Sequence, residues 1–322
     1  MAVYTQVSFD EASLLLQRLQ LGQLQSMEGC SGGIENTNYF VTTDSGAYVL
    51  TLFERLSAEQ LPFYLRLMKH LAQGGIPVPE PAADERGALQ YLVNGKPATV
   101  VNRLRGKSEL APQAEHCASV GAWLAKMHLA GQGFDLQQPN LRGLNWWNDT
   151  VPVILPFLDA AQASLIQSEL AYQNHVAASS VYAALPRGAI HADLFRDNVM
   201  FAPASREGDS ALEMTGFFDF YFAGVDTWVF DLSVCLNDWC VDLATGAHNP
   251  ERMQSCIDAY DGVRTLTSAE RKALPGMLRA AALRFWISRL WDLHLPREAS
   301  VLTAHDPTHF ERVLRQRLRF AA

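Results

Sequence analysis

The sequence predicts an α+β protein with a small antiparallel β-sheet lobe carrying one main helix, residues 1–104, and a larger, mostly helical lobe, residues 105–322. Two hairpin patterns lie within residues 36–102, whereas from about residue 108 apolar residues recur with helical spacing. Short β-rich segments interrupt the helices only around residues 189–201 and 213–222. A chain of 322 residues is long enough for two lobes with separate cores.

The first lobe is expected to begin with a short amphipathic helix. Ser8 and Glu11 form a capping box before the run LLLQRL, and Gly22 is the expected stop. The runs NYFVTT and AYVLTLF, both rich in β-branched and aromatic residues, then flank Asp44-Ser45-Gly46. This arrangement predicts a first β-hairpin.

The main helix of this lobe is expected to be capped by Ser57 and to end at Gly74-Gly75. Its apolar residues share one helical face: Leu61, Tyr64, Leu65, Met68 and Leu71. After the extended segment IPVPEP, the runs ALQYLV and KPATVVNRL flank Asn94-Gly95, a strong two-residue hairpin signal. The lobe boundary should follow near residues 101–106, and domain junctions of this kind are favoured nucleotide sites.

The second lobe is expected to be helical. Pro112 and Pro307 suit first-turn positions of two of its helices. The helices are expected at about 111–130, 156–180, 228–243, 249–261, 267–293 and 306–320.

Composition narrows the class of protein. Apolar residues make up 48% and charged residues 19% of the chain, as in folded soluble proteins. The net charge of −8 and the lack of a basic run argue against a nucleic-acid partner. No signal peptide and no apolar run long enough for a membrane span is evident, so we expect no membrane partner. Five cysteines without a C-x-x-C pair suit a reducing cytoplasm, where buried thiols act as small apolar side chains.

The segment IHADLFRDNVMF, residues 190–201, carries the strongest functional signal. His191, Asp193 and Asn198 have the spacing His-x-Asp-x-x-x-x-Asn, and Asp219 lies in a second apolar run, GFFDFYF. Kinase-type phosphoryl transfer uses one carboxylate to meet the hydroxyl nucleophile, and an amide oxygen with a second carboxylate to bind Mg²⁺ on the ATP phosphates. Asp193 is therefore the candidate base, and Asn198 and Asp219 are the candidate metal ligands.

Two further residues are candidates near that segment. His191 could be catalytic, but its apolar flank favours a hydrogen bond that stabilises the loop, near the backbone of Asp219. Asp231 could anchor the same loop through backbone N–H groups, or it could be an ordinary carboxylate near a helix N-terminus.

The candidate phosphate loop is SGGIENTNYFV. Gly32 and Gly33 would let the backbone approach phosphates, and Asn36 and Asn38 could stabilise the turn. Protein kinases carry a lysine on the following strand, in a V-A-I-K context, whereas this chain has Thr51 in the stretch VLTL. Thr51 offers a hydroxyl but no charge, so phosphate neutralisation would depend on Mg²⁺, backbone amides or another cation.

The motifs resemble a known family. HADLFRDN with FFDFYFAG is similar to the aminoglycoside-phosphotransferase-like kinases of small alcohols. More narrowly, GIENTNYFV, VLTLFE, HADLFRDNVMF, LNDWC and RFWISRL resemble the homoserine kinases on that scaffold. The resemblance implies a bilobal protein-kinase-like fold, ATP and Mg²⁺ as cofactors, and phosphorylation of the L-homoserine side-chain hydroxyl to O-phospho-L-homoserine in threonine biosynthesis. It assigns the base position to Asp193 and the metal positions to Asn198 and Asp219.

An amino-acid substrate carries an ammonium group and a carboxylate, so its pocket should offer an acid or carbonyls and an arginine fork. Candidates are Arg196, Asp238 with Trp239, and Arg284 or Arg289; for each, a structural ion pair or a packed helix position is an equal alternative.

Three other functions stay open. The first is a kinase of another small alcohol, such as choline, a sugar or an aminoglycoside. The second is an inactive nucleotide-binding scaffold, for which Thr51 is the only support. The third is a hydrolytic metal site at His191 and Asp193, which lacks a second histidine at usable spacing.

Overall fold

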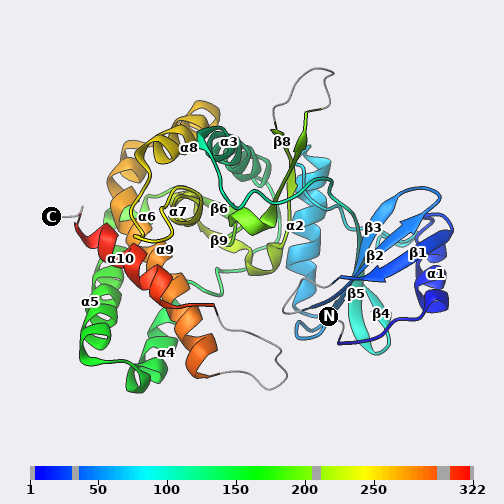
Figure 1. Ribbon diagram of the computed structural model, residues 1–322, viewed down its shortest axis with the longest axis horizontal. Coiled ribbons are helices and arrows are strands. Elements are labelled where there is room, and N and C mark those ends of the chain that lie inside the picture. The colour runs from blue at the N-terminus through cyan, green and yellow to red at the C-terminus, as the bar shows by residue number, and fades with distance from the viewer. Residues whose placement is uncertain (1–3, 31–35, 205–211, 296–304, 320–322) are drawn as a thin grey trace. The chain divides into compact units, whose positions relative to one another are not determined.

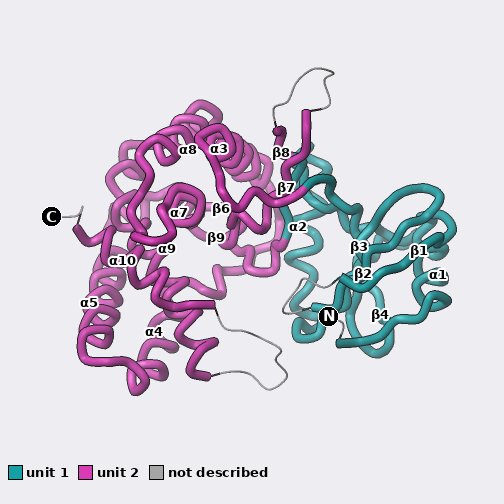
Figure 2. Tube along the Cα trace, viewed as in Figure 1, with its two compact units in different colours: residues 1–106, 215–218 teal, residues 107–214, 219–322 magenta. Residues whose placement is uncertain are grey.

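The computed structural model describes residues 4–30, 36–204, 212–295 and 305–319 (Figure 1). The chain divides into two compact units (Figure 2). Unit 1 comprises residues 1–106 with 215–218, and unit 2 comprises residues 107–214 with 219–322. No helix in the described ranges is long and apolar enough to cross a membrane.

Unit 1 is built on a five-stranded antiparallel sheet with the order β1-β2-β3-β5-β4. Two helices, α1 (Phe9–Arg18) and α2 (Leu61–Gln73), complete it. The strands are β1 (Leu24–Gly29), β2 (Asn36–Thr43), β3 (Ala47–Phe53), β4 (Tyr91–Val93) and β5 (Lys96–Asn102). Leu15 and Leu16 of α1 share a core with Val41, Leu50 and Val100 of the sheet, which explains the period-2 burial along β2.

Both expected hairpins are present in unit 1. Asp44-Ser45-Gly46 joins β2 to β3, and Asn94-Gly95 joins β4 to β5 with positive φ angles of 49° and 76°, as a type I′ turn requires. The Ser8–Glu11 capping box is also confirmed.

Two details of unit 1 differ from expectation. Helix α2 begins at Leu61 with Gln60 as its N-cap, so Ser57 does not cap it; Ser57 lies in the preceding turn, where its backbone N–H donates to Gln60 Oε1 (2.9 Å). Strand β1, LQSMEG, was not anticipated, because its sequence is too polar for a strand pattern and it is defined by pairing with β2.

Unit 2 is mainly helical. Its long helices pack around α7, in which every residue is buried, and α9, which contributes Leu283, Trp286 and Ile287 to the core. The helices are α3 (Ala114–Ala130), α4 (Leu144–Ile154), α5 (Ala160–Ala177), α6 (Ser180–Ala183), α7 (Trp228–Trp239), α8 (Pro250–Val263), α9 (Ser268–His294) and α10 (Thr308–Arg319).

Short strands interrupt these helices. Strand β6 (Arg187–Ile190) pairs with β9 (Gly224–Thr227), and β7 (Val199–Pro203) pairs with β8 (Leu212–Phe217), whose last three residues belong to unit 1. Strands β6, β7 and β8 overlap the predicted ranges, whereas β9 lies beyond residue 222. Two 3₁₀ turns, η2 (Arg196–Asn198) and η3 (Phe220–Phe222), lie beside them, and η1 (Leu155–Phe157) follows α4.

The remaining differences concern helix boundaries. Helix α4 was not expected, because Pro152 interrupts its pattern near the C-terminal end. Pro112 lies outside α3, whose N-cap is Gln113, and Pro307 precedes the first residue of α10, so the first-turn placement of both prolines was wrong. All five cysteines are free, and four of them are buried.

Candidate active site

The candidate catalytic loop follows β6 and is held by a single carboxylate of α7. Asp231 accepts the backbone N–H of His191 at Oδ2 (2.8 Å) and that of Ala192 at Oδ1 (2.7 Å). Ala192 has φ of 64°, a conformation that a non-glycine residue adopts only when its surroundings require it. The expectation that Asp231 anchors this loop is confirmed.

Asp231 also connects the loop to α3 and α8. His128 Nε2 lies 3.0 Å from Asp231 Oδ2, and His128 Nδ1 lies 2.7 Å from the hydroxyl of Tyr260. Burial lowers the pKa of His128, so the ring is neutral. A carboxylate can only accept, so Nε2 carries the proton and Nδ1 accepts from Tyr260. Burial alone would raise the pKa of Asp231. The hydrogen bonds from His128 and from the backbone N–H of His191 outweigh burial, so the pKa of Asp231 is lowered.

His191 is fully buried and acts on the loop itself. Its Nδ1 accepts the backbone N–H of Asp193 (3.2 Å), and its ring lies 4.5 Å from that of Phe220, the residue after Asp219. These contacts favour the structural role over the catalytic one. The histidine thereby connects the segment that carries Asp193 with the segment that carries Asp219.

Asp193 and Asn198 face each other across the loop. Asn198 donates through Nδ2 to the Asp193 carbonyl (2.9 Å) and, more distantly, to Asp193 Oδ2 (3.5 Å). Among the described residues the Asn198 amide oxygen has no hydrogen-bond donor, so it is available to a ligand. An amide whose nitrogen steadies the loop while its oxygen stays available fits a hard cation such as Mg²⁺.

The electrostatics of Asp193 suit a proton acceptor. Burial raises its pKa well above the usual range, the Arg284 charge opposes that rise, and the carboxylates of Asp219, Asp197 and Asp238 add to it. A carboxylate with a raised pKa binds a proton more tightly when it meets a hydroxyl. The influence of Asp219 also places the two carboxyl groups within electrostatic reach of each other.

Asp219 precedes η3 and has φ of 68° and ψ of 60°. It is one of four non-glycine residues with positive φ in the described chain, together with Gln20, Asn94 and Ala192. Two of these four residues therefore lie in the segments that carry the candidate base and the candidate metal ligands. Strained backbone is retained where the surrounding structure imposes it, which is common at active sites.

Three of the five candidate substrate contacts, Arg196, Asp238 and Trp239, are engaged within the protein. Arg196 donates to Asp238 Oδ2 through its backbone N–H (2.8 Å) and through Nε (3.1 Å), and it also donates to the carbonyl of Asp238. Trp239 is fully buried and donates its indole N–H to the carbonyl of Leu194 (3.0 Å). These contacts favour the structural alternative for Arg196, Asp238 and Trp239.

Arg284 differs from these three candidates. It lies on α9, is 3% exposed, and makes no hydrogen bond or ion pair with any residue in the described ranges. Arg289, one turn further along, donates to the carbonyl of Asp306 (2.9 Å) and lies over the Phe310 ring.

The candidate phosphate loop is only partly described, since Gly32 and Gly33 lie outside the described residues. Asn38 and Thr51 are cross-strand partners, and the Thr51 hydroxyl donates to Asn38 Oδ1 (2.7 Å). Asn36 begins β2 opposite Phe53. The position where kinases carry lysine is thus a neutral, hydrogen-bonded pair.

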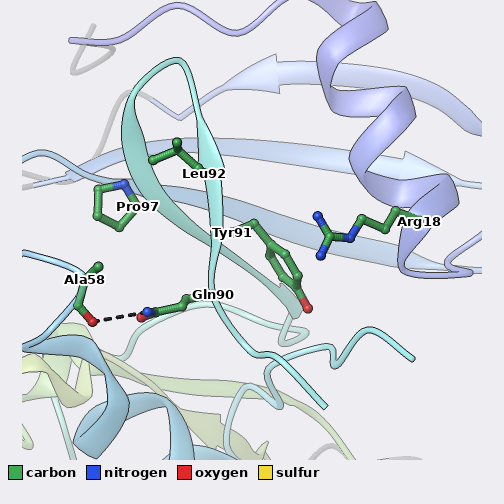
Figure 3. Close-up of a pocket in the computed structure, with 6 residues that line it drawn as sticks. All are labelled: Arg18, Ala58, Gln90, Tyr91, Leu92 and Pro97. Carbon is green, nitrogen blue, oxygen red and sulfur yellow. Dashed lines mark hydrogen bonds between the residues drawn. The ribbon is translucent and has the colours of Figure 1, made fainter. Parts of the chain in front are cut away.

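A surface cavity of about 330 Å³ lies elsewhere in unit 1, beside β4 (Figure 3). Within it, Gln90 Nε2 donates to the carbonyl of Ala58 (3.1 Å), and Arg18 lies 5.3 Å from the centre of the Tyr91 ring. It contains none of the residues that the sequence singled out. Its lining consists of Arg18, Ala58, Gln90, Tyr91, Leu92 and Pro97.

The described part of the chain contains no group of three or more His, Cys, Asp or Glu side chains arranged to hold a metal. In the hydrolytic alternative at His191 and Asp193, His191 would have to bind the metal, but its Nδ1 already accepts the backbone N–H of Asp193 (3.2 Å). A cation shared between Asn198, Asp219 and nucleotide phosphates needs no such group, because phosphate oxygens supply the other ligands.

Sequence reasoning did not identify His128, Tyr260, Arg142 or Phe222. His128 lies 103 residues from Asp231 in the sequence, and Tyr260 lies 132 residues from His128. Both residues are in helices without a motif. Arg142 and Phe222 come together through a cation–π contact of 5.9 Å between a loop and η3. Of these four residues, His128 alone had a signal in the sequence, because it is a histidine on the apolar face of the predicted helix that became α3.

Known proteins resemble this chain along its full length. Residues 26–292 match the model of the phosphotransferase enzyme family. A homoserine kinase of Polaromonas naphthalenivorans (strain CJ2) is 63% identical over 99% of this chain and 98% of its own length. A homoserine kinase of Janthinobacterium sp. (strain Marseille) is 54% identical, over 99% and 96% respectively.

Solved structures agree on the fold. An amicoumacin kinase in complex with AMP-PNP, Ca²⁺ and Ami matches with a TM-score of 0.68 at 16% identity, over 97% of this chain and 93% of its own. A choline/ethanolamine kinase family protein from Mesorhizobium loti matches with a TM-score of 0.64 at 18% identity, over 97% and 94%. The expected α+β, protein-kinase-like fold is confirmed, and the chain belongs to the phosphotransferase enzyme family.

Proposed function

We propose that this protein transfers the γ-phosphoryl group of ATP to the side-chain hydroxyl of L-homoserine, giving O-phospho-L-homoserine and ADP, a step of threonine biosynthesis in the cytoplasm. The observation that carries the proposal is the agreement between two independent features. Full-length relatives at 54% and 63% identity are homoserine kinases, and this chain has a buried carboxylate, Asp193, beside an available amide oxygen, Asn198.

In the proposed reaction Asp193 accepts the hydroxyl proton as the substrate oxygen attacks the γ-phosphorus and the bond to ADP breaks. The raised pKa of its carboxyl group favours that acceptance. Asn198 and Asp219 would hold Mg²⁺, which would neutralise charge on the phosphates when bound. His191 and Asp231 position the loop that carries Asp193.

We assign nucleotide binding to residues 1–104 and catalysis to residues 105–322. Gly32 and Gly33 would bring backbone N–H groups to the phosphates, and Asn36, Asn38 and Thr51 would shape the neighbouring strands. Thr51 supplies no positive charge, so in this proposal Mg²⁺ and backbone amides neutralise the phosphates. The proposal includes no nucleic-acid or membrane partner.

The test is a coupled ADP-release assay with Mg²⁺ and ATP across L-homoserine, L-serine, choline, methylthioribose and kanamycin, with the product identified by phosphorus NMR. We expect L-homoserine to have the highest kcat/KM. Phosphorylation of choline or kanamycin without L-homoserine would instead establish a different small-alcohol kinase. If none of the five compounds causes ADP release, the result would support an inactive scaffold.

A further inference from the structure

Arg284 is a buried cation with no hydrogen-bond or ion-pair partner among the described residues. Its guanidinium lies 3.7 Å from the centre of the Phe285 ring and 5.0 Å from that of Phe222. Nη2 is buried without a hydrogen-bond acceptor, and no residue in the described ranges forms an ion pair with the side chain. A buried charge without a hydrogen-bonded counter-ion is costly, and two aromatic faces offset only part of that cost. Such an arrangement is retained where a ligand supplies the missing acceptors.

The position of Arg284 relates it to the reacting group. The ring of Phe285, the residue after Arg284, lies 4.4 Å from that of Phe195, two residues after Asp193 in the loop. Phe222, whose ring the Arg284 guanidinium contacts, lies three residues after Asp219. Arg284 therefore lies beside both segments that carry the candidate catalytic groups, and it forms neither a hydrogen bond nor an ion pair with Asp193.

A second cation lies beside the first. Arg142, in the loop before α4, is 4.5 Å from the centre of the Trp146 ring and 5.9 Å from that of Phe222, the ring that Arg284 also contacts. Arg142 also weakens protonation of Arg284 by charge repulsion. An anion bound beside this ring would interact favourably with both positive charges.

We infer that Arg284, with Arg142 beside it, binds the α-carboxylate of the acceptor amino acid and so presents the side-chain hydroxyl to Asp193. This inference rests on the proposed function for the identity of the acceptor. The guanidinium fork matches the two oxygens of a carboxylate. The subsite would select amino-acid alcohols and reject alcohols that lack a carboxylate, because those would leave Arg284 without acceptors.

The test pairs two substrates with two enzymes. L-Homoserine and 3-amino-1-propanol share the amine and the hydroxyl, but only L-homoserine has the carboxylate. We expect Arg284→Met to lower kcat/KM for L-homoserine about 100-fold, the size of one charge-assisted interaction, and to change that for 3-amino-1-propanol less than threefold. Equal losses for the two substrates would overturn the inference.

Control variants separate this role from a structural one. Arg271→Met makes the same change on the same helix at an exposed ion pair with Asp261 and should leave both substrates unaffected. Arg284→Lys keeps the charge without the fork and should show a loss between those of wild type and Arg284→Met. If Arg284→Met fails to fold, Arg284→Lys alone decides, because a purely structural role would lower both activities together.

A binding measurement distinguishes failure of this inference from failure of the proposed function. L-2-Aminobutyrate has the carboxylate and lacks the hydroxyl, so it should bind wild type and lose about 100-fold in affinity with Arg284→Met. If wild type phosphorylates L-homoserine but L-2-aminobutyrate binds both proteins equally, only the carboxylate assignment fails. If L-homoserine is not phosphorylated at all, the proposed function fails and the inference, which depends on it, fails as well.

Discussion

Arg196 and Arg284 are both buried in unit 2, yet their surroundings are opposite. Arg196 donates to the side chain and carbonyl of Asp238 and to the carbonyl of Leu110. Arg284 contacts two phenylalanine rings and has no such acceptor in the described part of the chain. The first arginine has its counter-ion within the fold, so its role is to stabilise the loop. The second has none, which points to a ligand.

The carboxylates of Asp238 and Asp193 differ in the same way as the two arginines. Asp238 accepts from two nitrogen atoms of Arg196, at 2.8 and 3.1 Å. Among the described residues, the Asp193 side chain accepts one long bond, from Asn198 at 3.5 Å. A pair that is satisfied within the protein contributes to folding, whereas an incompletely satisfied group is available for chemistry. Residues of one chemical type therefore divide into structural and functional members according to their partners.

The largest expected effect is on turnover. Asp193→Asn should lower kcat for L-homoserine about 1000-fold, because the amide cannot accept the hydroxyl proton. Its free energy of unfolding should be unchanged or higher, since a neutral amide is less costly to bury than a carboxylate with one long hydrogen bond. Steady-state kinetics and urea denaturation measure the two effects. Near-wild-type turnover would remove Asp193 from the proposed role.

The next effect is on stability. Arg196→Met should lower the free energy of unfolding by about 3–5 kcal/mol, because it leaves the Asp238 carboxylate buried without its counter-ion. Arg284→Met makes the same substitution where there is no ion pair to break, so its unfolding free energy should stay within about 1 kcal/mol of wild type. Urea denaturation of both variants compares them. Equal destabilisation would contradict the distinction between the two arginines.

A smaller effect concerns the acid stability of the His128 network. Burial lowers the pKa of His128, so the folded state binds a proton less readily than the unfolded chain does. Stability is thus fully present above the unfolded pKa of about 6.5 and is lost as the pH falls, by up to about 1.4 kcal/mol per pH unit. His128→Gln should lose less stability than wild type between pH 8 and pH 5. Equal losses in urea denaturation would show that His128 does not contribute.

The smallest expected effect is a shift in the pH dependence of activity. Burial raises the pKa of Asp193, and the Arg284 charge partly opposes that rise. Arg284→Met removes the opposing charge, so the acidic limb of the kcat/KM profile should move to higher pH, whereas Arg271→Met should not move it. Profiles of the three proteins, with folding checked by circular dichroism at each pH, test this. A shift to lower pH would contradict the assigned interaction.

Predictions from sequence were accurate where the structure depends on local chemistry. The two hairpins follow from turn residues and alternating strands, and the first helix follows from the Ser8–Glu11 capping box. Helix α4 and strand β1 were missed, because a helix containing Pro152 and a polar edge strand owe their stability to packing and pairing. The start of α2 was misplaced, because residues 58–60 form a turn that separates Ser57 from the first helical residue, Leu61.

For the candidate site, the sequence alone determined the chemical groups: the His191-to-Asn198 motif and Asp219 have a pattern that is informative without coordinates. Only the tertiary structure decided which neighbouring charges are satisfied. Arg196 finds its partner 42 residues away in Asp238, and His128 finds Asp231 at a separation of 103 residues. A side-chain type specifies charge and hydrogen-bonding capacity, whereas its role depends on burial and on partners that folding brings from elsewhere in the chain.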